Sequence, residues 1–158
     1  RGVIGLKTEL MTSTRGHAII HHVFDQYKPV GDDIGSGNIH GSIIAAVPGT
    51  STAYALNGAQ DRGILFISPG REVYTGMIIG QHARDLDLEY NVCKTKNLTN
   101  MRASGADDAV VLTTPKKITL EYALEYIGSD ELIEVTPKNI RLRKKFLDAN
   151  DRKRKKAA

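Results

Sequence analysis

The stretch ILFISPGREVYTGMIIGQH, residues 64–82, decides the fold class. Its two apolar runs are separated by a Pro-Gly pair at 69–70 and by Gly76. Isoleucine, valine and aromatic residues favour strands, whereas Pro-Gly and single glycines interrupt strands as turns. We therefore predict paired strands at ILFI, EVY and MIIG, within an α+β fold that is mostly antiparallel β and carries two or three short helices.

The flanking sequence predicts further strands and helices. Residues 85–92 and 139–143 alternate apolar and polar side chains, which is typical of a strand with one wet face. The other strands are expected at 17–27, 42–47, 109–115 and 131–135. Helices are expected at 3–13, at 52–63 between a Ser51 or Thr52 cap and Gly63, and at 120–128 between Thr119 and Gly128. Leu120, Ala123, Leu124 and Ile127 would form the apolar stripe of the last helix.

Size and composition favour one medium domain or a small pair of domains. The chain has 158 residues, of which 41% are hydrophobic and 25% charged, so it can bury a core. No apolar run is long enough to span a membrane, the first residues lack the zones of a signal peptide, and Cys93 is the single cysteine. We expect a soluble, cytoplasmic protein without a membrane partner.

The net charge of +4 conceals an uneven distribution. Residues 138–158 contain ten basic and two acidic residues, so the remainder of the chain is net negative. A second basic segment, CKTKNLTNMRASG at 93–105, contains no acid. Clustered Lys and Arg neutralise phosphates and release counterions, which points to nucleic acid. A solvated tail and a polar loop without a ligand remain the alternatives.

The basic loop has suitable side chains for RNA. Its cations could hold phosphates, its asparagines could reach sugars or base edges, and its hydroxyls could make short contacts. These side chains are Lys94, Lys96 and Arg102, then Asn97 and Asn100, then Thr99 and Ser104. On the strand at 139–143 and just after it, we expect Arg141, Arg143, Lys144 and Lys145 to anchor on RNA as well.

Catalytic signatures are missing from the sequence. It contains no phosphate-loop, G-x-S-x-G or H-E-x-x-H motif, and no paired cysteines. His21 and His22 are adjacent in a predicted strand, so they would point to opposite faces and could not readily share a metal. We expect no enzyme activity, no metal and no cofactor in this chain. A nucleotide site in the Gly-rich loop at 31–41 and a protein-interaction domain are the alternative functions.

Four segments carry a family resemblance. They are RGVIGLKTELMTSTRG (1–16), ALNGAQDRG (55–63), REVYTGMIIGQHARDLDLEYNVCKTKNLTNMRASGADDAV (71–110) and TLEYALEYIGSDELIEVTPKNIRLRKKFLD (119–148). Together they resemble the C-terminal part of the BipA/TypA family of ribosome-associated translational GTPases. The LTNMRASG and ELIEVTPKNIRLRKK stretches are specific, and the likeness extends over nearly the whole chain.

The resemblance implies a domain arrangement. Residues 1–29 would be a helix–strand remnant of a ferredoxin-like module shared with elongation factor G. Residues 30–147 would form the family-specific C-terminal domain, and 148–158 a basic tail. The missing part of the module would leave the strand at 17–27 with an exposed edge, so we expect it to pair with a second copy or to pack on the C-terminal domain.

The resemblance also implies partners. The family binds the ribosome. Its basic loop contacts the acceptor end of A-site tRNA and nearby large-subunit ribosomal RNA, and by position this loop corresponds to residues 93–105. The family is linked to stress and to ribosome assembly. GTP and Mg would bind an N-terminal domain that lies outside this sequence.

Overall fold

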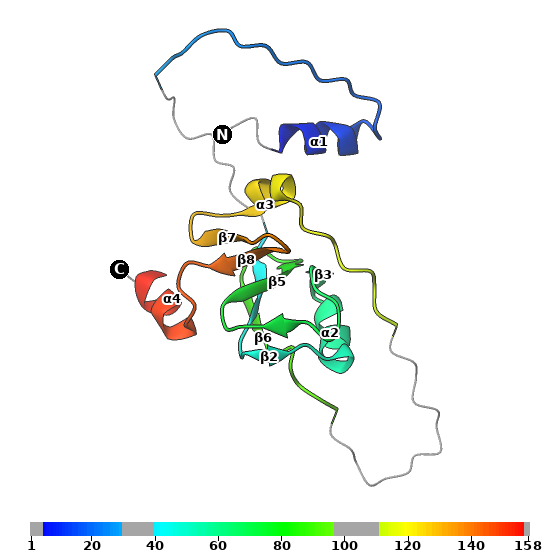
Figure 1. The fold of residues 1–158 in the computed structure, drawn as a ribbon, viewed down its shortest axis with the longest axis vertical. Helices are drawn as coiled ribbons and strands as arrows, with labels where there is room; N and C mark the ends of the chain where they lie inside the picture. The colour runs from blue at the N-terminus through cyan, green and yellow to red at the C-terminus, as the bar shows by residue number, and fades with distance from the viewer. Residues whose placement is uncertain (1–4, 30–39, 97–110, 157–158) are drawn as a thin grey trace.

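The computed structural model describes residues 5–29, 40–96 and 111–156 (Figure 1). Its strands are β1 (Ser42–Ala45), β2 (Gly49–Thr50), β3 (Gly63–Leu65), β4 (Glu72–Val73), β5 (Met77–His82), β6 (Leu88–Tyr90), β7 (Glu131–Val135) and β8 (Ile140–Lys144). Its helices are α1 (Leu6–Ser13), α2 (Ala53–Gln60), α3 (Leu120–Tyr126) and α4 (Ala149–Lys156). The predicted α+β fold with mainly antiparallel strands and short helices is confirmed.

Strand β5, from the stretch that decides the fold class, is the centre of the main sheet. The sheet order is β6-β1-β5-β8-β7, with β3 also paired to β5. All of these pairs are antiparallel except β1 with β6. Strands β2 and β4 form a separate two-stranded sheet. The turn that the sequence predicts at 69–70 leads into β4.

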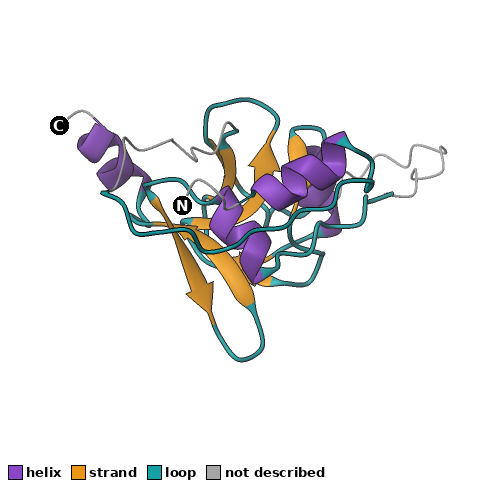
Figure 2. Cartoon of the chain, turned by 90° about the horizontal axis from the view of Figure 1, so that it is seen from above, coloured by secondary structure: helices purple, strands orange, loops and turns teal. Residues whose placement is uncertain are grey.

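Two hydrophobic clusters use opposite sides of β5. Ile79 lies in a cluster with Leu56 and Ala59 of α2, whereas Ile78 packs with Ala123 of α3 and Leu142 of β8. Successive side chains of a strand point to opposite faces, which explains why adjacent isoleucines reach different clusters. Helices α2 and α3 therefore cover different faces of the sheet. Helix α4 lies apart from the other helices, at the end marked C (Figure 2).

Both predicted N-caps on the core helices are confirmed. The side chain of Thr52 accepts a hydrogen bond from the backbone N–H of Ala55, and Thr119 does the same for Tyr122. Each bond satisfies a helix N–H that has no intrahelical partner. The predicted C-cap at Gly63 is wrong, because α2 ends at Gln60 and Gly63 already begins β3.

The predicted strand at 17–27 is wrong. The described residues after α1 form neither a helix nor a strand as far as residue 29, and Figure 1 shows them running away from the sheet. Ile19 is 83% exposed and Tyr27 is 93% exposed. Strand-forming residues need a neighbouring strand to pair with and a surface to pack against, and this segment has neither in the described structure. It therefore does not pack on the sheet domain as expected.

The predicted strand at 109–115 is also wrong over its described part, residues 111–115. The side chain of Gln60 binds this segment instead: its amide donates to the carbonyl of Val111, and its oxygen accepts from the N–H of Thr113. A side chain of α2 thus satisfies backbone groups that a neighbouring strand would otherwise pair. Residues 109 and 110 lie outside the described residues.

Two predicted apolar faces are only partly correct. In α3 the buried side chains are Ala123 and Tyr126, whereas Leu120 and Leu124 are exposed. The helix turns its tyrosine side towards the sheet because Phe66 offers an aromatic partner there, with ring centroids 5.4 Å from Tyr126. In the segment at 85–92, Leu86 is 72% exposed, because the strand begins only at Leu88.

Candidate nucleic-acid interface

The backbone at the start of the basic loop at 93–105 is hydrogen-bonded to the residue that caps α2. Val92 is fully buried, and its carbonyl accepts the N–H of Thr52. The hydroxyl of Thr52 donates to the carbonyl of Lys94 at 2.6 Å. The side chains of Lys94 and Lys96 are exposed. The cap of α2 therefore fixes the backbone from which the loop leaves.

The remaining predicted loop residues, Asn97, Thr99, Asn100, Arg102 and Ser104, lie outside the described residues. The Gly-rich loop proposed for a nucleotide, residues 31–41, is described only at its last two positions. Within the described ranges, no group of three or more His, Cys, Asp or Glu side chains could hold a metal ion. No described helix is long and apolar enough to cross a bilayer.

The two predicted arginines of β8 share a face but differ in their surroundings. The Nε of Arg143 lies 3.0 Å from a carboxylate oxygen of Glu134 on β7. The hydroxyl of Tyr74 donates to the other oxygen of Glu134 at 2.6 Å. Burial raises the pKa of Tyr74, and this bond raises it further. Arg141, in contrast, has no ion-pair partner in the described part of the chain.

Lys144 does not fit its predicted role as an RNA anchor. Its side chain is only 3% exposed, and its ammonium lies 2.8 Å from Asp87, 2.9 Å from Glu131 and 3.1 Å from Asp130. Burial lowers the pKa of Lys144, but hydrogen bonds and charge from Asp87 and Glu131 outweigh burial and raise the pKa overall. An ammonium enclosed by three carboxylates is not available to a phosphate.

The sequence contained a signal for this placement. Lys144 continues the alternation of Ile140 and Leu142, so it points to the same side of β8 as these apolar residues and away from Arg141 and Arg143. The buried network extends beyond the lysine. The hydroxyl of Ser42 donates to Glu131 at 2.7 Å and lies 2.8 Å from the hydroxyl of Tyr126. Every polar group needs such a partner when it is removed from water.

The last predicted anchor, Lys145, is exposed, and its backbone N–H donates to the carbonyl of Asp130. Beyond it, α4 is attached by Arg152. This guanidinium donates to the carbonyls of Phe146 and Leu147 and pairs with Glu89 at 2.9 Å. The side chains of Lys153, Arg154 and Lys155 stay exposed. The basic tail thus includes a described helix with exposed cations.

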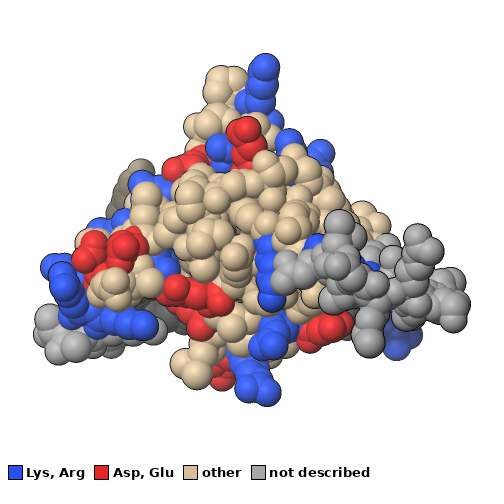
Figure 3. All heavy atoms as spheres, turned by 90° about the horizontal axis from the view of Figure 1, so that it is seen from below, with Lys and Arg blue, Asp and Glu red and all other residues tan. Residues whose placement is uncertain are grey.

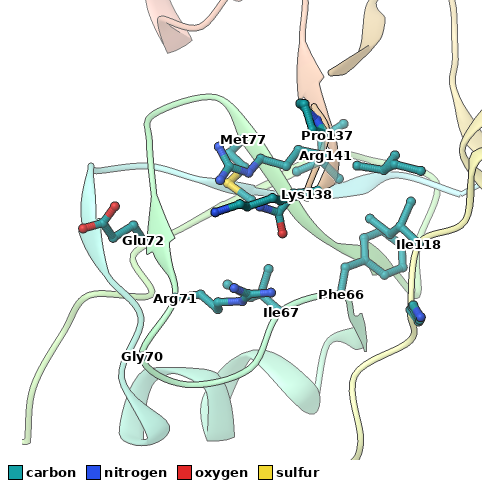
Figure 4. Close-up of a pocket in the computed structure, with 14 residues that line it drawn as sticks. Phe66, Ile67, Gly70, Arg71, Glu72, Met77, Ile118, Pro137, Lys138 and Arg141 are labelled. Atoms are coloured by element: carbon teal, nitrogen blue, oxygen red, sulfur yellow. The ribbon is translucent and has the colours of Figure 1, made fainter. Parts of the chain in front are cut away.

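A groove that sequence reasoning missed brings four basic residues together. Arg71 follows the turn at 69–70, Lys117 precedes α3, Lys138 lies in the β7–β8 turn and Arg141 lies on β8. We call these four residues and the hollow between them the basic groove. Its volume is about 760 Å³. In Figure 4, Arg71, Lys138 and Arg141 lie around one opening, with Phe66, Ile67 and Ile118 beside it.

The basic groove and the start of the loop are connected through the residues before α2. The backbone N–H of Arg71 donates to the hydroxyl of Ser51, and the hydroxyl of the next residue, Thr52, donates to the carbonyl of Lys94. Lys and Arg side chains also occur in several groups on the face in Figure 3, with acidic side chains between them. Charge alone therefore does not outline one binding surface on this face.

The family model described as "TypA/BipA C-terminal domain" matches residues 40–149. This match spans more than half of the chain. The chain belongs to the TypA/BipA C-terminal domain family. The matched region of this family includes every strand of the structure, both core helices, Lys94 and the basic groove.

Three relatives of this TypA/BipA chain are named "Large ribosomal subunit assembly factor BipA". The Synechocystis protein is 49% identical over 144 residues, 91% of this chain and 24% of its own length. The Haemophilus influenzae protein is 50% identical over 155 residues, and that of Bacillus subtilis 44% over 154. Each of these two alignments covers 98% of this chain and 25% of the relative. The chain spans about a quarter of the length of these relatives.

Proposed function

We propose that this chain is the ribosome-binding module of a longer translational GTPase, and that it contacts RNA through the loop at 93–105. The supporting observation is its family membership together with relatives named as assembly factors of the large ribosomal subunit. We place its action in the cytoplasm, on large-subunit ribosomal RNA and the acceptor end of A-site tRNA. GTP and Mg would bind elsewhere in the longer protein, and we assign no catalysis to this chain.

The described side chains support a positioning role. Lys94 and Lys96 are exposed where the loop begins, Lys145 is exposed just after β8, and Arg141 on β8 is half-buried. Exposed cations bind phosphates without reading sequence, and they fix a protein's orientation on nucleic acid. Lys144 is not part of this proposal because its charge is satisfied internally, and Arg143 is secondary because it pairs with Glu134.

The test is binding to purified large ribosomal subunits over a salt series, with Lys94, Lys96 and Arg102 changed together to Ala. We expect weaker binding and a salt-dependence slope shallower by about 0.7 for each lost phosphate contact. The matched control changes the exposed residues Lys7, Arg62 and Arg84 to Ala, which removes the same charge elsewhere. Equal effects of the two triple variants would contradict the role of the loop.

The two alternative functions predict different results, one in the same binding assay and one in thermal unfolding. A protein-interaction domain would bind subunits at high salt and through exposed apolar residues. A nucleotide site at 31–41 would raise the melting temperature of the chain when a mononucleotide is added. Salt-insensitive binding, or thermal stabilisation by the nucleotide, would favour these alternatives.

We also propose self-association through residues 17–29. Val23 and Phe24 are 90% and 71% exposed, and a second chain would remove them from water. Sedimentation of the chain over a concentration series tests this proposal, with Phe24→Asp as the variant. A wild-type chain that stays monomeric at high concentration would refute it.

A further inference from the structure

We propose that the basic groove binds the sugar-phosphate backbone of a single-stranded RNA segment, with a base resting on the apolar floor at Phe66 and Ile118. This inference rests on the proposed function and deepens it, since it adds RNA contacts at residues other than those of the loop at 93–105. The residues that would bind the phosphates of this RNA are Arg71, Lys117, Lys138 and Arg141.

The charges of the groove are available to a ligand. None of its four basic side chains makes an ion pair or a side-chain hydrogen bond with the part of the chain that the structure describes. On β8 itself, Arg143 and Lys144 are paired with carboxylates, whereas Arg141 has no ion-pair partner in the described part of the chain. Among the described residues that line the hollow, Glu72 is the one acidic residue.

The four cations lie on backbone that is fixed by hydrogen bonds to neighbouring segments. Pairing of β7 with β8 places Arg141 opposite Glu134 and closes the turn that carries Lys138. The N–H of Lys116 donates to the carbonyl of Leu65 at 2.8 Å, which fixes the segment that carries Lys117. The backbone N–H of Arg71 donates to the hydroxyl of Ser51 at 3.0 Å. The backbone under each cation is thus set before a ligand arrives, which reduces the entropy lost on binding.

The floor of the groove suits an unstacked base. Phe66, Ile118 and Ile140 are half-buried there. The ring of Phe66 is held edge-on against Tyr122 and Tyr126, with centroids 5.9 and 5.4 Å apart. Single-stranded nucleic acid is commonly bound by a basic groove with apolar or aromatic side chains for its bases. A base in a duplex would first have to unpair and unstack to reach this floor, which favours a single strand.

The size of the hollow and its arginines favour RNA over simpler anions. A volume of about 760 Å³ is in the range of pockets that hold whole small molecules, so the hollow has room for more than one phosphate. Arg71 and Arg141 each carry a guanidinium that can bind phosphate oxygens in a bidentate manner. An acidic homopolymer such as poly-glutamate would also match the charge but would have no flat group for the floor.

The experiment measures anisotropy of a labelled short oligouridine bound by the full chain. The groove variant is Arg71→Gln with Lys138→Gln, both exposed. Loss of two phosphate contacts should weaken binding about 25-fold at about 0.1 M salt and reduce the salt slope by about 1.4. The matched control is Lys7→Gln with Arg62→Gln, both exposed, and it should bind as the wild type does. A groove variant that binds like this control would overturn the inference.

Two further arms separate the possible failures. If the groove variant binds oligouridine normally while the loop variant loses ribosome binding, the groove inference fails and the proposed function stands. If the wild type binds neither RNA nor subunits, both fail. Poly-glutamate should compete poorly. Displacement of the RNA by poly-glutamate at equal charge would show recognition of charge alone and would also overturn the inference.

Discussion

The ammonium of Lys144 lies 2.9 Å from the carboxylate of Glu131, and both side chains are only 3% exposed. Glu131 begins β7, and Asp87, which also pairs with Lys144, lies just before β6. Strands β6 and β7 are the outermost strands in the sheet order. One buried charge thus joins the segments where two edge strands begin.

Replacing Lys144 with Met should cost about 3–5 kcal/mol of unfolding free energy, because it leaves Glu131 buried without its counter-charge. Urea unfolding measures the change. Lys145→Met is the matched control, since this neighbouring lysine is exposed and should change stability by no more than about 0.5 kcal/mol. Similar stability losses for the two variants would show that the buried pair is not a main support of the sheet.

The local parts of this fold could be predicted from the sequence. Strand β7 was predicted with its bounds, and Thr52 and Thr119 were predicted as caps, because alternation and capping are read from adjacent residues. The segment at 17–27 has the same strand-like composition, yet it forms no strand in the described structure. A strand needs a partner, and composition does not show whether one is present.

The candidate site depends on contacts distant in sequence. Arg71, Lys117 and Lys138 lie far apart along the chain, and they reach one groove only through the turn before β4, the segment before α3 and the β7–β8 turn. A prediction from runs of basic residues therefore favours Lys144 and Lys145 and misses the groove. It also treats Lys144 as accessible, although the alternation of side chains along β8 places Lys144 on the buried face of the strand.

The stability of the fold should decline above pH about 10 because of two tyrosines. Burial raises the pKa of Tyr74, as does its hydrogen bond to Glu134, and burial likewise raises the pKa of Tyr122. Since both folded-state values lie above the unfolded one, their stabilising effect is complete below the unfolded pKa and is lost as pH rises above it. Urea unfolding over a pH series measures this decline.

The same tyrosines give a spectroscopic readout. Phenolate absorbance from Tyr74 and Tyr122 should appear only when the chain unfolds, after the exposed tyrosines have titrated. The variant Tyr74→Phe with Tyr122→Phe should lack this late step and should lose less stability at high pH. If all tyrosines of the native chain ionise in one step near their ordinary pKa, the burial argument does not hold.

Thr52→Ala should destabilise the chain by about 1 kcal/mol, the usual cost of an N-cap. The hydroxyl of Thr52 accepts from the N–H of Ala55 at 3.2 Å and donates to the carbonyl of Lys94 at 2.6 Å. Hydrogen exchange at the Ala55 amide should accelerate. Thr52→Ser keeps both bonds and should remain close to wild type. A Ser variant as unstable as the Ala variant would show that the methyl group, not the hydroxyl, carries the effect.

Gly76→Ala should be more destabilising than Gly70→Ala. Both glycines have a positive φ, +84° and +79°, which costs a residue with a Cβ roughly 1–2 kcal/mol. At Gly70 nothing lies within 4 Å of an added Cβ, whereas at Gly76 the Cβ would be 2.7 Å from the Cα of Leu147. Gly76 also donates to the carbonyl of Ala45 and accepts from the N–H of Lys144, so its backbone cannot shift without loosening β1 and β8. The urea concentration at the unfolding midpoint should therefore fall further for Gly76→Ala than for Gly70→Ala, with the same dependence of unfolding free energy on urea. Equal midpoints for the two variants would mean that the chain after β8 moves aside for the new methyl group without cost.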